Sequence, residues 1–345
     1  MPTGGARSAR SATPASASER PRVERRARRT RADRERRGRG MNGVPVVFVH
    51  VHHPDVWAEM ARDIAAALSR PFGLVITCRD ADMALAPVES PHLVFSRRLT
   101  VENRGRDVLP FMKALRAEGD GFEIGLKLHT KRSVHRADGD QWRRFLTGSL
   151  LAGEDGTPDA LVAMERVPTL GLVAPEAHLL ALRSRIVLNG RITRRMIEAM
   201  GLGLTLAELE GRRFAAGSMF WFRREALTSF ADPALEPLFA PERGQLDGTA
   251  AHAAERLFAA VAERQGFVAA GAEALPALRD APPDRMAAVA EAAAAEARNP
   301  FVLPLGQFWQ RYPAALVAAH YLYLYSPQPV WRAARALFRR FTVDR

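Results

Sequence analysis

Cysteine is almost absent from this sequence, with Cys78 the single one among 345 residues. One cysteine forms neither a disulfide framework nor a cysteine zinc cluster, and a lone thiol suits a protein of the reducing cytoplasm. No run of eighteen apolar residues occurs, so no membrane-spanning helix is expected. The P-loop pattern Gly-x4-Gly-Lys-Ser/Thr and the nucleophile elbow Gly-x-Ser-x-Gly are missing too.

Lysine is scarce as well: Lys113, Lys127 and Lys131 are the three in the chain, and the other basic residues are arginines. The formal charge of +12 is unevenly spread, because residues 1–40 hold thirteen arginines and four acidic residues and contribute +9 of it. The remaining +3 is too little for the basic stripe of a nucleic-acid-binding protein, so no nucleic-acid partner is expected.

Residues 1–42 are rich in Arg, Ser, Ala and Pro, a composition that predicts disorder. Such a segment is an arm for nucleic acid or a membrane surface, a transit-like leader, or upstream sequence mistakenly read as coding. Met41 stands directly before the first apolar strand, which favours the last interpretation or a dispensable tail.

Apolar runs alternate with helical patterns through residues 43–271. Strands are predicted at 44–51, 72–77, 92–95, 122–128, 170–174 and 214–223, the last interrupted by a glycine, and helices at 54–68, 108–117, 141–151, from the cap Thr157 onward, and at 249–265. This order is typical of an α/β domain with a Rossmann-like, mostly parallel sheet flanked by helices. Residues 272–345 are predicted to form a helical C-terminal extension.

The strand predicted at 122–128 leads into a basic and hydroxyl-bearing turn, Lys127-Leu-His129-Thr130-Lys131-Arg-Ser. Ligands of open α/β sheets bind at the carboxyl ends of the strands, where these side chains offer a phosphate both charge and hydrogen-bond donors. The alternative is a solvated basic turn.

Two further strand ends carry polar clusters. His50-Val-His52-His53-Pro-Asp55 offers imidazoles and a carboxylate to a metal, but no pair of carboxylates accompanies it, so a role in lining a site is favoured. Asn103-Arg104-Gly105-Arg106-Asp107 precedes a helix and suits an anion; alternatively Asp107 caps that helix and the arginines are solvated.

Four ionisable side chains, Glu242, Asp247, His252 and Glu255, surround one loop and the start of one helix. A carboxylate or imidazole so placed can act as a general base. Alternatively, Asp247 and Thr249 shape the turn and Glu255 lies at the surface.

Together these motifs resemble the rhamnan synthesis protein F family, which is tied to the assembly of rhamnose-containing and other cell-surface polysaccharides. The resemblance covers about 44–270 and rests on the histidine cluster, 103–111, 127–133, Ala216-Gly217-Ser218-Met219-Phe220-Trp221, and 242–249 with His252 and Glu255.

The resemblance implies a GT-A-like, nucleotide-sugar-binding domain. Its activity would be that of a glycosyltransferase that moves rhamnose or another deoxyhexose from a nucleoside-diphosphate donor to a lipid-linked or growing cell-surface glycan, such as a lipopolysaccharide O-antigen. The alternative is a carbohydrate-binding or scaffold protein of polysaccharide assembly that has lost catalysis.

The resemblance also assigns roles to residues. The donor and its phosphates are assigned to His50, His52, Asn103, Arg104, Arg106, Asp107, Lys127, His129, Thr130 and Lys131; the rest of the substrate to Gly217, Ser218, Trp221, Gln245, Thr249 and Glu255; and catalysis to Asp247 as the base, Glu242 as its competitor, and His252. No cofactor or metal is expected, because Asp80-Ala-Asp82 stands too early for an Asp-x-Asp motif after the central strand and is expected in a surface loop.

The C-terminal stretch 331–341 alternates arginines with apolar residues. It is expected to form a basic amphipathic helix that lies on an anionic membrane surface, or that packs its apolar side on the domain. The expected location is therefore the cytoplasm, at the inner face of the cytoplasmic membrane.

Overall fold

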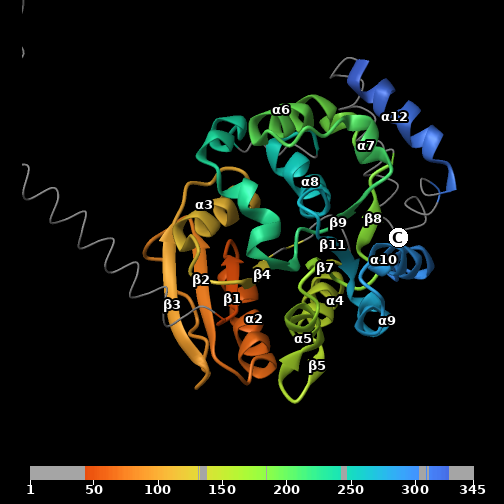
Figure 1. The fold of residues 1–345 in the computed structure, drawn as a ribbon. Coiled ribbons are helices and arrows are strands. Elements are labelled where there is room, and N and C mark those ends of the chain that lie inside the picture. The colour runs from red at the N-terminus through yellow and green to blue at the C-terminus, as the bar shows by residue number, and fades with distance from the viewer. Residues whose placement is uncertain are drawn as a thin grey trace, which may run out of the picture. The chain divides into compact units, whose positions relative to one another are not determined.

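A β-sheet forms the centre of the fold (Figure 1). The computed structural model describes residues 43–130, 132, 138–183, 185–241, 247–302, 308 and 311–325, and these described residues group into one compact unit. Within the described residues the sheet has seven strands in the order β3-β2-β1-β4-β10-β7-β11. Their bounds are β1 Val46–His50, β2 Phe72–Cys78, β3 Leu93–Thr100, β4 Ile124–His129, β7 Leu170–Ala174, β10 Phe220–Arg223 and β11 Val268–Gly271.

Strand direction agrees with the predicted α/β class. β1 is parallel to β2 and β4, β2 is parallel to β3, and β11 is parallel to β7. β10 alone among these strands is antiparallel to its neighbours β4 and β7. The predicted mostly parallel sheet flanked by helices is confirmed, and it is consistent with a Rossmann or GT-A-like fold. The reversed direction of strand β10 was not predicted.

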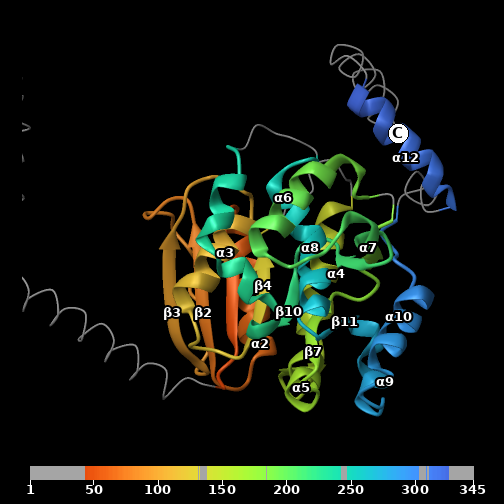
Figure 2. The ribbon, with the colours of Figure 1, turned by 45° about the horizontal axis from the view of Figure 1, so that its top comes forward.

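Helices cover both faces of the sheet (Figures 1 and 2). Val47 and Val49 of β1 belong to one core cluster and Val46 and Phe48 to the other, because successive side chains of a strand point to opposite faces. The first cluster includes helices α2 (Pro54–Ala67), α4 (Gly139–Leu151), α5 (Asp159–Arg166), α9 (Leu275–Arg279) and α10 (Met286–Glu296), and the second includes α3 (Val108–Glu118), α6 (Gly190–Met200), α7 (Leu206–Glu210) and α8 (Ala250–Arg264).

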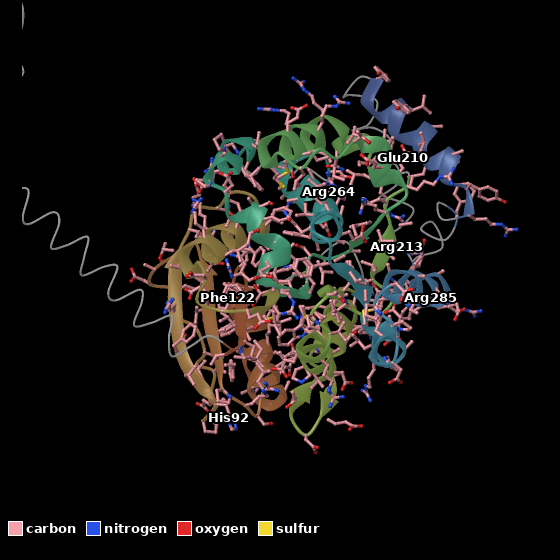
Figure 3. The ribbon with its side chains drawn as sticks, in the orientation of Figure 1. His92, Phe122, Glu210, Arg213, Arg264 and Arg285 are labelled. Carbon is pink, nitrogen blue, oxygen red and sulfur yellow. The ribbon has the colours of Figure 1, made fainter. Side chains whose placement is uncertain are left out.

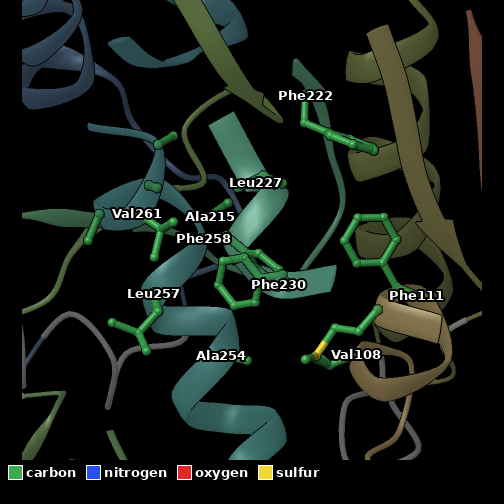
Figure 4. Close-up of a cluster of buried hydrophobic side chains, with 14 of the residues drawn as sticks. Val108, Phe111, Ala215, Phe222, Leu227, Phe230, Ala254, Leu257, Phe258 and Val261 are labelled. Atoms are coloured by element: carbon green, nitrogen blue, oxygen red, sulfur yellow. The ribbon is translucent and has the colours of Figure 1, made fainter. Parts of the chain in front are cut away.

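The core between α3, α8 and β10 is aromatic (Figure 4). Phe111 meets Phe222 edge to face with ring centroids 5.3 Å apart, and Phe258 lies 4.5 Å from Phe230. Aromatic pairs of this geometry add to the stabilisation that burial gives. At the carboxyl end of α8, Arg264 (labelled in Figure 3) donates to the carbonyl of Leu202 and anchors the helix. The carboxyl end of α8 is thereby tied to the segment that follows α6.

Two local predictions are wrong. The single strand predicted at 214–223 is two strands: β9 (Arg213–Ala215) pairs with β8 (Leu179–Ala181), while β10 joins the main sheet. The left-handed backbone of Gly217 and Ser218, with φ of +90° and +58°, turns the chain between them. Thr157 does not cap α5; it belongs to β6 (Thr157–Pro158), which pairs with β5 (Gly153–Glu154).

Beyond α10 the described chain ends with α12 (Pro313–Tyr325). Residues 331–341, predicted as a basic amphipathic helix, lie outside the described residues, as do residues 1–42. None of the helices in the described part of the chain combines the length and the apolar character needed to cross a membrane.

Candidate active site at the carboxyl ends of the strands

A cavity of about 450 Å³ opens at the carboxyl ends of β1 and β4, where the sequence places its polar motifs. It is lined by His50, His52, His53, Asn103, Arg106, Asp107, Val108, His129, Thr130, Arg132, Gly217, Ser218, Ala251, His252 and Glu255. Motifs far apart in the sequence thus meet in one place, as expected for an open α/β sheet.

Thr130 joins the ends of β1 and β4. Its Oγ1 accepts hydrogen bonds from the backbone N–H groups of His52 (2.8 Å) and His53 (2.9 Å), and its own N–H donates to the His50 carbonyl (3.1 Å). These bonds fix the turn that leads from β1 into α2. The hydroxyl at position 130 therefore positions the histidine cluster.

Lys127 is buried beneath the cavity and does not line it. Its side chain is 2% exposed, and Nζ donates to Asp107 Oδ2 (2.5 Å), Ser218 O (2.6 Å) and Ser218 Oγ (2.9 Å). An ammonium group has three N–H donors, and these bonds use all of them. Lys127 therefore ties the 103–107 loop to the 217–218 turn, whereas the sequence predicts that it contacts phosphate.

Asp107 precedes α3 but makes no side-chain cap bond there, because its carboxylate pairs with Lys127. Burial alone would raise the pKa of Asp107, but the interactions with His129 and Lys127 together hold this pKa far below its ordinary value. A carboxylate of such low basicity is a poor proton acceptor. Asp107 consequently serves as a fixed negative charge in the cavity wall.

The 217–218 turn is shaped by bonds on both sides. Gly217 N–H donates to Glu255 Oε1 (2.8 Å), and the His129 ring donates from Nε2 to the Gly217 carbonyl (2.8 Å). Ser218, at the cavity, and Arg106 are two of the four non-glycine residues with positive φ in the described chain. Strained backbone of this kind gathers at functional sites.

His252 lines the cavity from the first turn of α8. Its Nδ1 lies 2.8 Å from Thr249 Oγ1 and 3.7 Å from Asp247 Oδ1, so Nε2 is the nitrogen that can serve a ligand. Burial lowers the pKa of His252 to about 4, and the positive charge of Arg106 adds to this effect. The imidazole is therefore neutral at pH 7 and can accept a proton.

Asp247, the predicted base, does not line the cavity, and its Oδ1 lies 3.7 Å from Nδ1 of His252. Its carboxylate accepts from Asn189 Nδ2 (2.8 Å) and from Arg256 Nη2 (2.9 Å). Asn189 belongs to the 3₁₀ turn Val187–Asn189 and Arg256 to α8, so the Asp247 carboxylate ties the start of α8 to this turn. Thr249 likewise bonds to His252 and does not reach the cavity.

His50 ends β1 with Nδ1 3.0 Å from Thr77 Oγ1 of the adjacent strand. Burial lowers the pKa of His50 to about 4, and the neighbouring His129 and Lys127 act in the same direction, while Asp107 opposes them. His50 is therefore a neutral side chain in the cavity wall.

The low pKa of His50 predicts a pH effect on stability. Between pH 6.5 and about 4 the unfolded chain binds a proton that folded His50 does not, so the free energy of unfolding should fall as the pH falls through this window. The His50 contribution is at most about 1.4 kcal/mol per pH unit. Urea unfolding between pH 7 and pH 4 should show a shallower pH dependence for His50→Gln than for the wild type. Equal slopes, or a His50 ring resonance that titrates near 6.5, would contradict the assignment.

The two arginines of the 103–107 loop have different surroundings. Arg106 lines the cavity, whereas Arg104 donates to Glu102 Oε1 (2.6 Å) and to the Phe239 carbonyl (3.4 Å) and lies outside it. Gly105, at φ +71°, separates them, and a Cβ there would lie 2.5 Å from Leu109 Cβ. Arg132 also lines the cavity and pairs with Asp55 of α2.

Trp221 is a core residue. Its side chain is fully buried, and Nε1 donates to the Leu150 carbonyl (2.8 Å). On β10 it points to the face opposite Phe220 and Phe222, toward α4 and α5. It therefore does not contact the cavity, contrary to its predicted role in substrate binding.

The cavity brings together most of the predicted site residues. Those that line it are His50, His52, Asn103, Arg106, Asp107, His129, Thr130, Gly217, Ser218, His252 and Glu255, whereas Arg104, Lys127, Trp221, Asp247 and Thr249 do not. Lys131, Glu242 and Gln245 lie outside the described residues. The sequence prediction did not assign His53, Val108, Arg132 and Ala251, although His53 and Arg132 belong to motifs that it identified.

The early Asp80-Ala-Asp82 motif forms an exposed turn in which Asp82 N–H donates to Asp80 Oδ1 (2.9 Å), and neither aspartate lines the cavity. Over the part of the chain that the structure describes, no group of three or more His, Cys, Asp or Glu side chains is arranged to hold a metal ion.

Comparison with known proteins gives a family match. A family model described as rhamnan synthesis protein F matches residues 29–267, beginning earlier than the start expected near residue 44. Two curated relatives, each named "Uncharacterized protein WxcX", come from two strains of Xanthomonas campestris pv. campestris. Each is 37% identical over 218 residues, which are 61% of this chain and 30% of the relative, so the chain spans well under half the length of these proteins.

Proposed function

The chain belongs to the rhamnan synthesis protein F family, a family of polysaccharide synthesis, and from this premise we propose that the cavity is the active site of a glycosyltransferase. The donor is a nucleoside-diphosphate sugar carrying rhamnose or another deoxyhexose. The acceptor is a lipid-linked or growing cell-surface glycan.

The observation that carries the proposal is the convergence of cationic groups and helix N-termini on one cavity. The amino ends of α2, α3 and α8 all lie there, since His53, Val108 and Ala251 line it. Backbone N–H groups and the helix dipole favour anions at such ends. Arg106 and Arg132 add two guanidinium groups, which suit the oxygens of a diphosphate.

These groups also suit the chemistry of transfer. When the glycosidic bond to the donor breaks, negative charge grows on the leaving diphosphate. Fixed positive charges and oriented N–H groups stabilise that charge in the transition state more than in the bound donor. Arg106 and Arg132 take this role in our proposal, in place of the predicted Lys127 and Arg104.

His252 is the favoured base for the acceptor hydroxyl. It faces the cavity and is neutral at pH 7, so Nε2 can take up the proton of the acceptor. Burial weakens its basicity, whereas the carboxylate of Asp247, 3.7 Å from Nδ1, favours the protonated ring that the transfer creates. Asp107 is too weakly basic, and Oε1 of Glu255 accepts the Gly217 N–H. Glu255 and Asn103 are assigned to hold hydroxyl groups of the sugars. Asp247 acts through His252 by holding the start of α8.

The proposal is tested by adding deoxythymidine-, uridine- and guanosine-diphosphate sugars separately and measuring melting temperature and sugar transfer. A bound donor at about 100 times its Kd stabilises the fold by roughly 2.7 kcal/mol. Stabilisation with transfer to a glycan acceptor is the expected result. Binding without transfer would indicate the scaffold function, and an absence of binding across the panel would contradict the nucleotide-sugar site.

The neighbouring arginines provide a matched pair for the phosphate site. Arg106→Ala should weaken the binding of a nucleoside diphosphate about 10- to 100-fold, because a charge-assisted hydrogen bond contributes about 1.5–3 kcal/mol. Arg104→Ala, two residues away and outside the cavity, should leave the Kd within about threefold of the wild type. Calorimetric titration measures both. An equal loss of nucleoside-diphosphate affinity in the two variants would mean that Arg106 does not bind the phosphates directly.

A further inference from the structure

Exposed large hydrophobic side chains are concentrated at the C-terminal end of the described chain. Of the six in the described residues, five belong to α12 or the residues just before it: Phe308 (45% exposed), Tyr312 (48%), Tyr321 (50%), Leu322 (64%) and Tyr325 (83%). The sixth, Val94 of β3, is 53% exposed and stands alone. Single exposed hydrophobic residues are ordinary, but a contiguous group indicates an interaction surface.

On α12 the exposed positions form one stripe. Among the α12 residues whose burial is described, the exposed ones are 314, 318, 321, 322 and 325. This spacing places them on one side of the helix. They are two alanines, two tyrosines and a leucine, and the helix contains no Asp, Glu, Lys or Arg at all. We call this surface the α12 stripe. A helix that faces water normally exposes charged residues. The α12 stripe exposes none, which indicates that it contacts an apolar partner.

Basic residues flank the α12 stripe in the sequence. Arg311 precedes α12, and residues 326–345 contain five arginines and one aspartate. Cationic residues next to an apolar surface match an anionic lipid bilayer, in which the charges meet headgroups and the apolar side chains enter the interface. Tyrosine suits this boundary, since its ring is apolar and its hydroxyl remains hydrated.

We propose that the α12 stripe docks this protein on the surface of an anionic membrane. A helix of thirteen residues is about 20 Å long, shorter than the hydrocarbon core of about 30 Å, so α12 lies on the bilayer and does not cross it. The helix packs against the 3₁₀ turn Val187–Asn189, whose Asn189 donates to Asp247 at the start of α8. The docking surface and the candidate active site therefore share a structural support.

The test is co-sedimentation of the full chain with vesicles of phosphatidylcholine alone and of phosphatidylcholine mixed with phosphatidylglycerol. The wild type should bind the anionic vesicles, and added salt should weaken this binding. The combined variant Tyr321→Ser, Leu322→Ser, Tyr325→Ser should bind them at least about tenfold more weakly, because three apolar side chains are lost. Val94→Ser, which removes an equally exposed hydrophobic residue from β3, should bind as the wild type does.

Melting curves check that the variants are folded. Their melting temperatures should match that of the wild type, because the changed side chains are exposed. A wild type that ignores anionic vesicles, or a triple variant that binds them as tightly as the wild type, overturns the proposal. So does a wild type that forms a dimer in solution and binds no vesicles while the triple variant is a monomer, because the α12 stripe would then face a second copy. Vesicle binding lost in the triple variant and retained in Val94→Ser supports it.

Discussion

His252→Gln should retain donor affinity and lower the turnover number by about 10²–10⁴-fold. Glutamine nearly fills the space of the ring but accepts no proton at neutral pH. The imidazole is well placed for this role, since it lines the cavity and its Nδ1 edge is bonded to Thr249, with Asp247 3.7 Å away. Single-turnover kinetics with saturating donor would isolate the chemical step from product release.

Asp247→Asn is the matched control for this experiment. Asparagine has one acceptor oxygen, so it can keep the bond from Asn189 or the bond from Arg256 but not both. The start of α8 should be weakened but not lost, and the loss of turnover should be smaller than in His252→Gln. A normal rate in His252→Gln would remove the histidine from the mechanism. A larger loss in Asp247→Asn than in His252→Gln would return the role of base to Asp247. A rate lost only in Glu242→Gln would move that role to Glu242.

Lys127→Met should reduce the free energy of unfolding by about 3 kcal/mol at pH 7, because it leaves the carboxylate of Asp107 without its ammonium partner. This is the lower end of the range for a buried pair, since the Asp107 side chain is 14% exposed. The change also removes the two bonds that hold Ser218 in its left-handed conformation. Adding Asp107→Asn to Lys127→Met should recover part of the loss, since the double variant has no uncompensated charge. Urea unfolding of both single variants and of the double variant measures the coupling directly.

Lys113→Met provides the comparison at the surface. Lys113 pairs with Glu102 (3.1 Å) and Glu236 (3.5 Å) in partly exposed positions, and such pairs contribute about 1 kcal/mol or less. If Lys127 were instead a direct phosphate ligand, Lys127→Met would keep its stability and lose donor affinity. That outcome would contradict the buried bonding described above.

The sequence alone determined most strands of the main sheet, though not β11, and the end at which the site lies. The strand predicted at 170–174 coincides with β7, and the strands predicted at 44–51, 72–77 and 122–128 agree with β1, β2 and β4 within two residues at each end. Patterns of apolar residues are local, so they are visible without any knowledge of partners. The polar motifs at 50–55, 103–107 and 127–130 follow strands, and parallel strands end on one side of a sheet.

Only the tertiary structure decided which side chains of each motif face the ligand. Arg104 and Arg106 look equivalent in the sequence, but the left-handed backbone at 105–106 directs one to Glu102 and the other to the cavity. Lys127 looks like a phosphate ligand, but its partners are Asp107 and Ser218, 20 and 91 residues away.

The same holds for the predicted base. Asp247 stands in a loop that looks catalytic, but Asn189, 58 residues earlier, and Arg256 on the next helix engage its carboxylate. The orientation of a charged side chain depends on the partners that compensate its charge, and those partners are brought together by the fold. Their distance along the chain is why no local pattern could reveal that His252, and not Asp247, faces the cavity.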